Sequence, residues 1–371
     1  MPPVEYAPPL TAPALPISRW QRTGPIVALL LLSPIISEVL YGATRISVIF
    51  VLIPEILTWG CAALIIRESV RRWNKGWQSM LLLGLALAVA EEWVIQQTSI
   101  APLVGLAKHA YGRVWGVNWV YSLWALGYES VWVVLVPVHL TELLFPARRD
   151  QPWLRTRGLV IASLVFVVGA CMAWYGWTQR ARVMIFHMPP YSPPPLYLAA
   201  AVAVIVLLIL AAYTAPSVHL RHSEVRHSEV IPNAAPSPQL VGMIVTALGS
   251  GWAAFVLLGF GSLPGVPYSL ALGAGLAWCG LTLFLMRRWT SSSDWGDAHR
   301  FALVFGGILG CMLGGFAVFK IGGALRIDWI GKAILNVAAV AWLIMIGRTI
   351  VGRTIVGRTI DGAPRITESS R

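Results

Sequence analysis

The sequence predicts an all-α fold, a polytopic transmembrane helix bundle of about ten spans with both termini cytoplasmic. The first observation is composition, since 57% of the 371 residues are hydrophobic and only 12% are charged. A soluble domain carries about 25% charged residues, so this chain lacks the inventory for a water-exposed surface. The second observation is that apolar segments recur along nearly the whole chain, and the third is the distribution of its basic residues.

Each apolar segment is long enough to cross a bilayer, whose hydrocarbon core of roughly 30 Å requires about 20 helical residues. The predicted spans are 25–42, 46–66, 79–100, 118–145, 158–178, 196–214, 239–260, 266–286, 301–319 and 328–347. They define a disordered proline-rich tail, a first membrane half of six spans, a flexible cytoplasmic linker, a glycine-rich second half of four spans and a basic cytoplasmic tail. These regions are 1–23, 24–214, 215–238, 239–347 and 348–371.

The basic residues predict the orientation of the bundle. With the N-terminus placed inside, the inner segments hold 20 of the 28 Lys and Arg residues and the outer segments hold 7. Cytoplasmic loops of membrane proteins carry such an excess, so both termini are predicted to be cytoplasmic. This bias also accounts for the formal net charge of +12, and no nucleic acid partner is expected.

Cysteine and histidine positions favour no metal site. The four cysteines occur singly in apolar segments, which predicts free, packed thiols. Three linker histidines could form a metal-binding tract, but the prolines around them favour a solvated loop. We therefore predict no metal, and the sequence indicates no cofactor. The cysteines are Cys61, Cys171, Cys279 and Cys311, and the histidines are His219, His222 and His227.

The ionisable residues inside the predicted spans are concentrated in the first four spans. Glu55, Glu91 and Glu129 fall at similar predicted depths, and Glu92 is adjacent to Glu91. A carboxyl group in hydrocarbon requires a partner, an aqueous cavity or a function. These four residues are candidates for a polar pathway or for carrying protons. The further ionisable residues of these spans are Glu38, His139 and Glu142.

Adjacent carboxylates repel, so at least one of Glu91 and Glu92 is expected to hold a proton in a shared site of low dielectric constant. That behaviour suits proton transfer or acid–base catalysis. It suits equally a protonated glutamate that serves as a structural hydrogen-bond donor. The sequence leaves these alternatives open.

Residues 90–96, Ala-Glu-Glu-Trp-Val-Ile-Gln, resemble the Glu-Glu-x-x-x-Arg motif of the CAAX-prenyl protease and bacteriocin-processing family of intramembrane enzymes. His139, four residues after Leu135, is similar in place to that family's Phe-x-x-x-His motif. The resemblance implies that Glu91 and Glu92 are catalytic carboxylates and that His139 positions water. A glutamine and a leucine replace the family's arginine and phenylalanine, and no later His-x-x-x-Asn or His-x-x-x-Asp motif lies within a span.

Gly306, Gly310 and Gly314 form a Gly-x-x-x-Gly ladder in the ninth predicted span. Small residues at this spacing allow two helix backbones to approach closely, so the ladder is predicted to pack helices. The packing could be internal, or it could join a second copy or another membrane protein.

Three functions follow from these features. The leading hypothesis is transport of a small solute, lipid or ion through a polar site in spans one to four. The alternatives are an intramembrane hydrolase, metal-independent or metal-assisted, and a non-catalytic scaffold subunit. The expected location is the bacterial inner membrane, with the lipid bilayer as the main partner.

Overall fold

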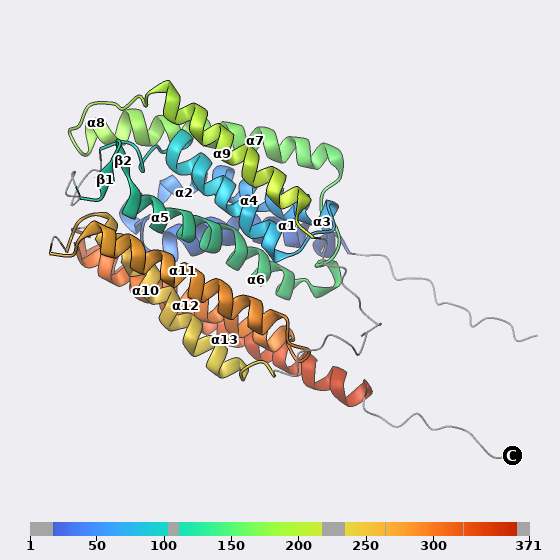
Figure 1. Ribbon diagram of the computed structural model, residues 1–371. Helices are drawn as coiled ribbons and strands as arrows, with labels where there is room; N and C mark the ends of the chain where they lie inside the picture. The colour runs from blue at the N-terminus through green and yellow to red at the C-terminus, as the bar shows by residue number, and fades with distance from the viewer. Residues whose placement is uncertain (1–17, 103–110, 217–233, 264, 322, 362–371) are drawn as a thin grey trace, which may run out of the picture.

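The computed structural model describes residues 18–102, 111–216, 234–263, 265–321 and 323–361. Ten helices among these residues are long and apolar enough to cross a membrane, which confirms the predicted transmembrane helix bundle. The helices run roughly antiparallel, so that the start of the first span and the end of the last lie at the same end of the bundle (Figure 1). We call this the terminal end. The opposite end, which carries a small β-hairpin, is the hairpin end.

Each of the first five spans is built from consecutive helical segments of different helix type, and the sixth is a single helix. The first four spans comprise α1 (Arg19–Pro34) with η1 (Ile35–Leu40); η2 (Ile46–Val51), α2 (Leu52–Glu55), η3 (Ile56–Gly60) and α3 (Cys61–Arg72); α4 (Trp77–Val89) with η4 (Ala90–Ile95); and α5 (Trp119–Tyr128), η5 (Glu129–Leu135) and α6 (Val136–Leu144). After η6 (Pro146–Arg148), the fifth and sixth spans comprise α7 (Thr156–Trp174), η7 (Tyr175–Ala181) and α8 (Arg182–Met184), and then α9 (Pro195–Thr214).

The last four spans are single helices. They are α10 (Pro238–Gly259), α11 (Tyr268–Thr290), α12 (Asp297–Ile321) and α13 (Arg326–Asp361). In Figure 1 these helices, coloured yellow to red, form a layer beside the blue-to-green first half.

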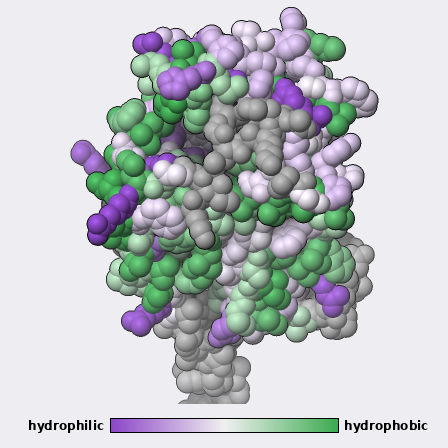
Figure 2. Space-filling view, turned by 90° about the vertical axis from the view of Figure 1, so that its left-hand side faces the viewer, coloured by the Kyte–Doolittle hydropathy of each residue, from purple (hydrophilic) through white to green (hydrophobic). Residues whose placement is uncertain are grey.

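A short antiparallel hairpin of β1 (Arg113–Val114) and β2 (Val117–Asn118) precedes the fourth span. Its two turn residues, Trp115 and Gly116, both have positive φ, at 49° and 75°. Such a turn matches the twist of the two strands. Asn118 then caps α5 by accepting from the Tyr121 amide and donates to the Gly259 carbonyl of α10, each at 3.0 Å. The hairpin thereby fixes where the fourth span begins. Figure 2 views this end of the molecule, where hydrophilic residues are scattered at the rim among hydrophobic ones.

The fourth span lies at the centre of the bundle. Of the residues in its most apolar stretch, 67% are buried. In the corresponding stretches of the fifth, sixth and eighth spans only 11% of the residues are buried, and these spans form the lipid-facing perimeter. Trp124, Tyr128 and Trp132 stack along the span, with ring centroids 4.8 and 5.1 Å apart. This aromatic column packs against the first, seventh and ninth spans. It therefore joins the two membrane halves.

The glycine ladder packs within the chain. A Cβ atom at Gly306, Gly310 or Gly314 would lie 2.5 to 2.8 Å from atoms of α10. The predicted packing role is thus filled by contact between α12 and α10. This face is covered within the chain and is not open to a second copy or another partner.

Some boundaries differ from the prediction. The third span was predicted to reach residue 100, but its helix ends at Ile95, and Gln97 has a φ of 60° that turns the chain. The predicted tails are shorter than expected, because α1 already begins at Arg19, where Ser18 caps it, and α13 continues to Asp361. Most of the predicted linker lies outside the described residues.

We expect Gly310→Ala to destabilise the protein by about 1 to 3 kcal/mol, because the added Cβ would overlap backbone atoms. Those atoms, Ser250 N and Thr246 O, would each be 2.8 Å away. Gly280→Ala is the matched control, since no atom lies within 4 Å of its Cβ position. Thermal unfolding in detergent measures both. Equal midpoints for the two variants would contradict the close packing of α12 on α10.

Candidate functional site

Four π-helical segments lie in the first four spans, and each carries or directly follows a glutamate. Glu38 lies in η1, Glu55 immediately precedes η3, Glu91 and Glu92 lie in η4, and Glu129 begins η5. π-Helical turns are rare and frequently occur at functional sites. Four of the five π-helical segments among the described residues thus lie beside the carboxylates that the sequence selects, and the fifth, η7, carries no glutamate.

The structure brings these five glutamates together in the half of the bundle nearer the hairpin end. We call Glu38, Glu55, Glu91, Glu92 and Glu129 the carboxylate cluster. Glu38 interacts electrostatically with Glu55 and Glu129, and Glu91 interacts with Glu38, Glu92 and Glu129. All except Glu38 are at most 6% exposed. The cluster therefore contains the four predicted pathway residues, together with Glu38.

Glu91 and Glu92, although adjacent, have different partners. Trp59 Nε1 donates to Glu91 Oε1 at 3.0 Å. Ser99 Oγ donates to Glu92 Oε2 at 3.0 Å, and the Tyr121 hydroxyl donates to Glu92 Oε1 at 3.3 Å. Ser99 reaches Glu92 from the turn that follows η4. Glu92 is thus satisfied on both oxygens.

Glu91 and Glu129 lie within hydrogen-bonding reach of each other and of Trp59. A hydrogen bond between two carboxyl groups requires a proton on one of them. Glu129 Oε2 and Glu55 Oε2 have no hydrogen-bond partner among the described residues, while the other Glu55 oxygen accepts from Thr44. Buried acceptors of this kind cost free energy unless they are protonated or bind a donor or cation. This part of the cluster is suited to take up positive charge.

A second polar network closes the terminal end of the bundle around Arg67, which is 0% exposed. Its guanidinium lies 3.6 Å from the centroid of the Trp153 ring. It also donates to Glu142 Oε1, Glu68 Oε1 and the carbonyl oxygens of Arg148, Arg149 and Gln151, at 2.6 to 3.3 Å. A buried arginine with this many partners rigidly joins α3 to the connection after α6.

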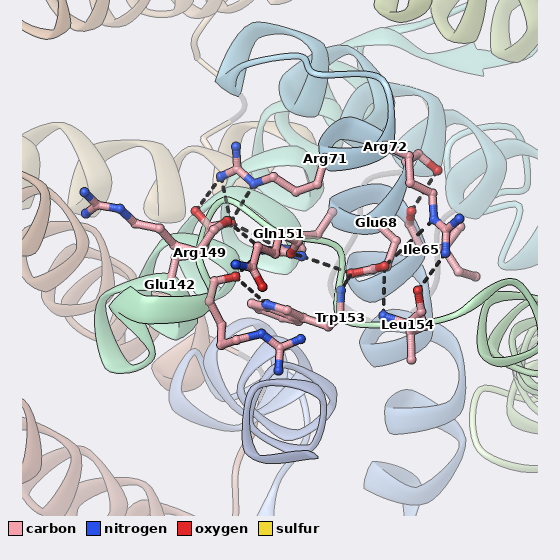
Figure 3. A network of polar contacts seen from close by, with 12 residues as sticks. Ile65, Glu68, Arg71, Arg72, Glu142, Arg149, Gln151, Trp153 and Leu154 are labelled. Atoms are coloured by element: carbon pink, nitrogen blue, oxygen red, sulfur yellow. Dashed lines mark hydrogen bonds and ion pairs between the residues drawn. The ribbon is translucent and has the colours of Figure 1, made fainter. Parts of the chain in front are cut away.

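Glu68 and Glu142 complete this network (Figure 3). Glu68 accepts the amides of Trp153 and Leu154 at 2.7 and 3.0 Å. Glu142 accepts from Arg71 at 2.7 Å through each of its oxygens. Because every carboxylate here is paired, the network is structural. This network was not predicted from the sequence, although the pair Arg67-Glu68 directly following an apolar segment was a signal for it.

The structure places His139 in this terminal region and not in the carboxylate cluster. Its electrostatic partners are Glu142, Arg71 and Arg300. Ten residues separate His139 from Glu129, about 15 Å along the helix. The three residues on which the family resemblance depends, Glu91, Glu92 and His139, are therefore not brought to one point.

The described residues bear on part of the metal prediction and on the prediction for the four cysteines. Among the described residues, no group of three or more His, Cys, Asp or Glu side chains is arranged to hold a metal ion. The linker histidines His219, His222 and His227 lie outside the described residues. All four cysteines are free, and Cys61 and Cys311 are buried as predicted. Cys171 is exposed on α7, so the prediction that it is packed was wrong, because α7 lies at the perimeter of the bundle.

No protein family model matches this chain, and neither does any curated protein or solved structure. The function must therefore be argued from the geometry of the chain's own residues.

We expect Arg67→Met to destabilise the protein by about 3 to 5 kcal/mol, because it leaves buried carboxylate and carbonyl groups without their cationic donor. Arg157→Met, which removes an exposed arginine at the same end of the bundle, should change stability by less than about 0.5 kcal/mol. Equilibrium unfolding in detergent measures both variants. Comparable losses in the two would show that Arg67 contributes no more than a surface charge.

Proposed function

We propose that this multi-pass membrane protein is a transport protein that moves a small solute, lipid or ion through spans one to four. In this proposal the carboxylate cluster binds and releases a proton during the transport cycle. The observation that carries the proposal is the convergence of five carboxyl groups from four spans. One buried oxygen of Glu55 and one of Glu129 have no hydrogen-bond partner in the described part of the chain.

An ionised carboxyl group is costly in a medium of low dielectric constant. Several carboxylates cannot all be ionised in one buried cluster, because each lacks water and repels the others. The number of bound protons therefore depends on how closely the groups approach one another and on their access to water. Any movement of the four spans that changes this distance or access changes proton binding. Such coupling between conformation and protonation is what an ion-coupled carrier requires.

The two alternatives have less support. Hydrolysis by Glu91, Glu92 and His139 requires a bound water within hydrogen-bond reach of both acidic and basic groups. The position of His139 in the terminal region does not favour that arrangement. A scaffold that docks a partner on the glycine ladder needs a free glycine face, and α10 covers this face.

The proposal keeps the orientation inferred from the basic residues. The terminal end, with the Arg67 network, then faces the cytoplasm, and the carboxylate cluster lies nearer the outer side of a bacterial inner membrane. Protons would enter the cluster from the hairpin end.

The proposal predicts the behaviour of a Glu91→Gln/Glu129→Gln variant in proteoliposomes. A potassium diffusion potential, negative inside, should drive proton uptake through the wild-type protein, recorded with a pH-sensitive dye trapped in the vesicles. The amides cannot exchange protons, so uptake should fall by about 100-fold.

Asp150→Asn is the matched control, because it neutralises an acidic residue at the other end of the bundle and should leave uptake unchanged. Wild-type uptake equal to that of protein-free vesicles would remove the proposal. The same conclusion would follow if the double variant conducted protons as well as the wild type.

A further inference from the structure

A groove of about 1000 Å³ lies between the two membrane halves. One side is formed by α4 and by the fourth span, and the other by α10, α11 and α12. None of the five glutamates of the carboxylate cluster lines it. It is therefore a separate site, at the upper end of the size range of small-molecule pockets.

The groove is polar at one end and apolar along the rest of its length. Its basic lining residues lie at the terminal end, where α3 meets α4, in the connection after α6, where α11 ends and where α12 begins. There are five of them against two acidic ones, so this end carries net positive charge. Farther from the terminal end, leucine and tryptophan side chains such as Leu85, Leu126 and Trp278 form the walls. The basic residues are Arg71, Lys75, Arg149, Arg287 and Arg300, and the acidic residues are Glu142 and Asp150.

Its length is enough to extend across one leaflet of a bilayer. Nine residue steps separate Trp278 from Arg287 on α11, about 14 Å, and the lining of the fourth span extends nineteen steps from Leu123 to Glu142, about 28 Å. Half of the hydrocarbon core is about 15 Å thick. A groove of this length accommodates the acyl region of a lipid whose headgroup lies at the terminal end.

The basic residues differ in their availability. Arg71 is held by Glu142, while Arg149 and Arg300 both approach Asp297. Arg287 is exposed, and its guanidinium makes no hydrogen bond or ion pair with any described residue. Lys75 extends from the connection between α3 and α4, where it donates to the Ala215 carbonyl. The aromatic rings of Trp73, Trp77 and Trp295 line the same end, at the level that indole rings prefer in a membrane.

We propose that this groove binds one anionic phospholipid from the leaflet at the terminal end. The phosphate lies at Arg287 and Lys75, and an acyl chain extends along Leu81, Leu85 and Trp278. Charge complementarity selects an anionic headgroup, since the basic residues exceed the acidic ones at that end. The apolar walls select an acyl chain rather than a soluble phosphate ester. The proposal does not depend on transport, because the groove and the carboxylate cluster share no glutamate.

The first measurement is native mass spectrometry of the full-length protein in detergent, titrated with phosphatidylglycerol or with phosphatidylcholine of the same acyl chains. We expect phosphatidylglycerol to bind at one saturable site and phosphatidylcholine to bind at least about tenfold more weakly. Lys75→Gln/Arg287→Gln should weaken phosphatidylglycerol binding by about tenfold or more.

The control variant is Arg155→Gln/Arg288→Gln, which removes the same charge from the same end. Arg288 adjoins Arg287 but does not line the groove, and Arg155 lies on the connection to α7. Its affinity for phosphatidylglycerol should equal that of the wild type. A second variant, Leu85→Trp, fills the apolar part of the groove and should weaken binding while all basic residues remain.

A phosphatidylglycerol with a photoactivatable acyl chain, in nanodiscs, then locates the site. Cross-links should map to 77–89 and 268–290, the residues of α4 and α11. Cross-links confined to the perimeter helices α7 and α9 would overturn the proposal, as would equal affinity of the two charge variants. Competition by glycerol 3-phosphate as strong as that by the whole lipid would show that the site binds a phosphate ester and not a lipid.

Discussion

Hydrocarbon cannot solvate polar groups, and this constraint underlies the whole arrangement of the chain. Backbone groups are satisfied within helices, while ionisable side chains must be satisfied by other parts of the protein. The third and fourth spans, which have the highest shares of buried residues, are therefore gathered in the interior, and the fifth, sixth and eighth spans, which carry no acidic residue, form the perimeter. The fourth span illustrates the rule, because it carries Glu129 and Glu142 and is the most buried of the ten candidate spans in the described chain. Its aromatic column provides the apolar contacts that hold both halves around it.

Two polar regions satisfy the constraint in different ways. At the terminal end, Arg67 and Arg71 neutralise Glu68 and Glu142 through short, charge-assisted hydrogen bonds. Such a region is rigid, because losing any member leaves a buried charge behind. In the carboxylate cluster the neighbouring carboxyl groups repel one another and do not neutralise each other's charge. Protons are the simplest means of neutralising them. A protein built only for stability has little reason to collect unpaired acids, and this contrast is the basis for assigning the cluster a function.

The η5 segment lies between the carboxylate cluster and the groove. Glu129 at its start belongs to the cluster, whereas Ser130, Val131 and Trp132 line the groove. Occupants of the two sites would thus contact the same π-helical turn from different sides. A shift of η5 would alter both sites together, which gives a physical route by which a lipid in the groove affects protonation of the cluster.

The sequence by itself determined the membrane class, the ten spans and the concentration of carboxylates in the first four. These follow from segment length, hydrophobicity and residue identity, which are local properties. It also identified the glycine ladder, since the spacing alone places three small residues on one helix face. Only the tertiary structure decided what those faces meet. The π-helical turns, the burial of Arg67, the separation of His139 from Glu91 and the groove between the halves depend on how each helix is rotated and which helix it packs against. Periodicity along one span does not fix that rotation, because in lipid a helix can bury any face that a neighbouring span matches.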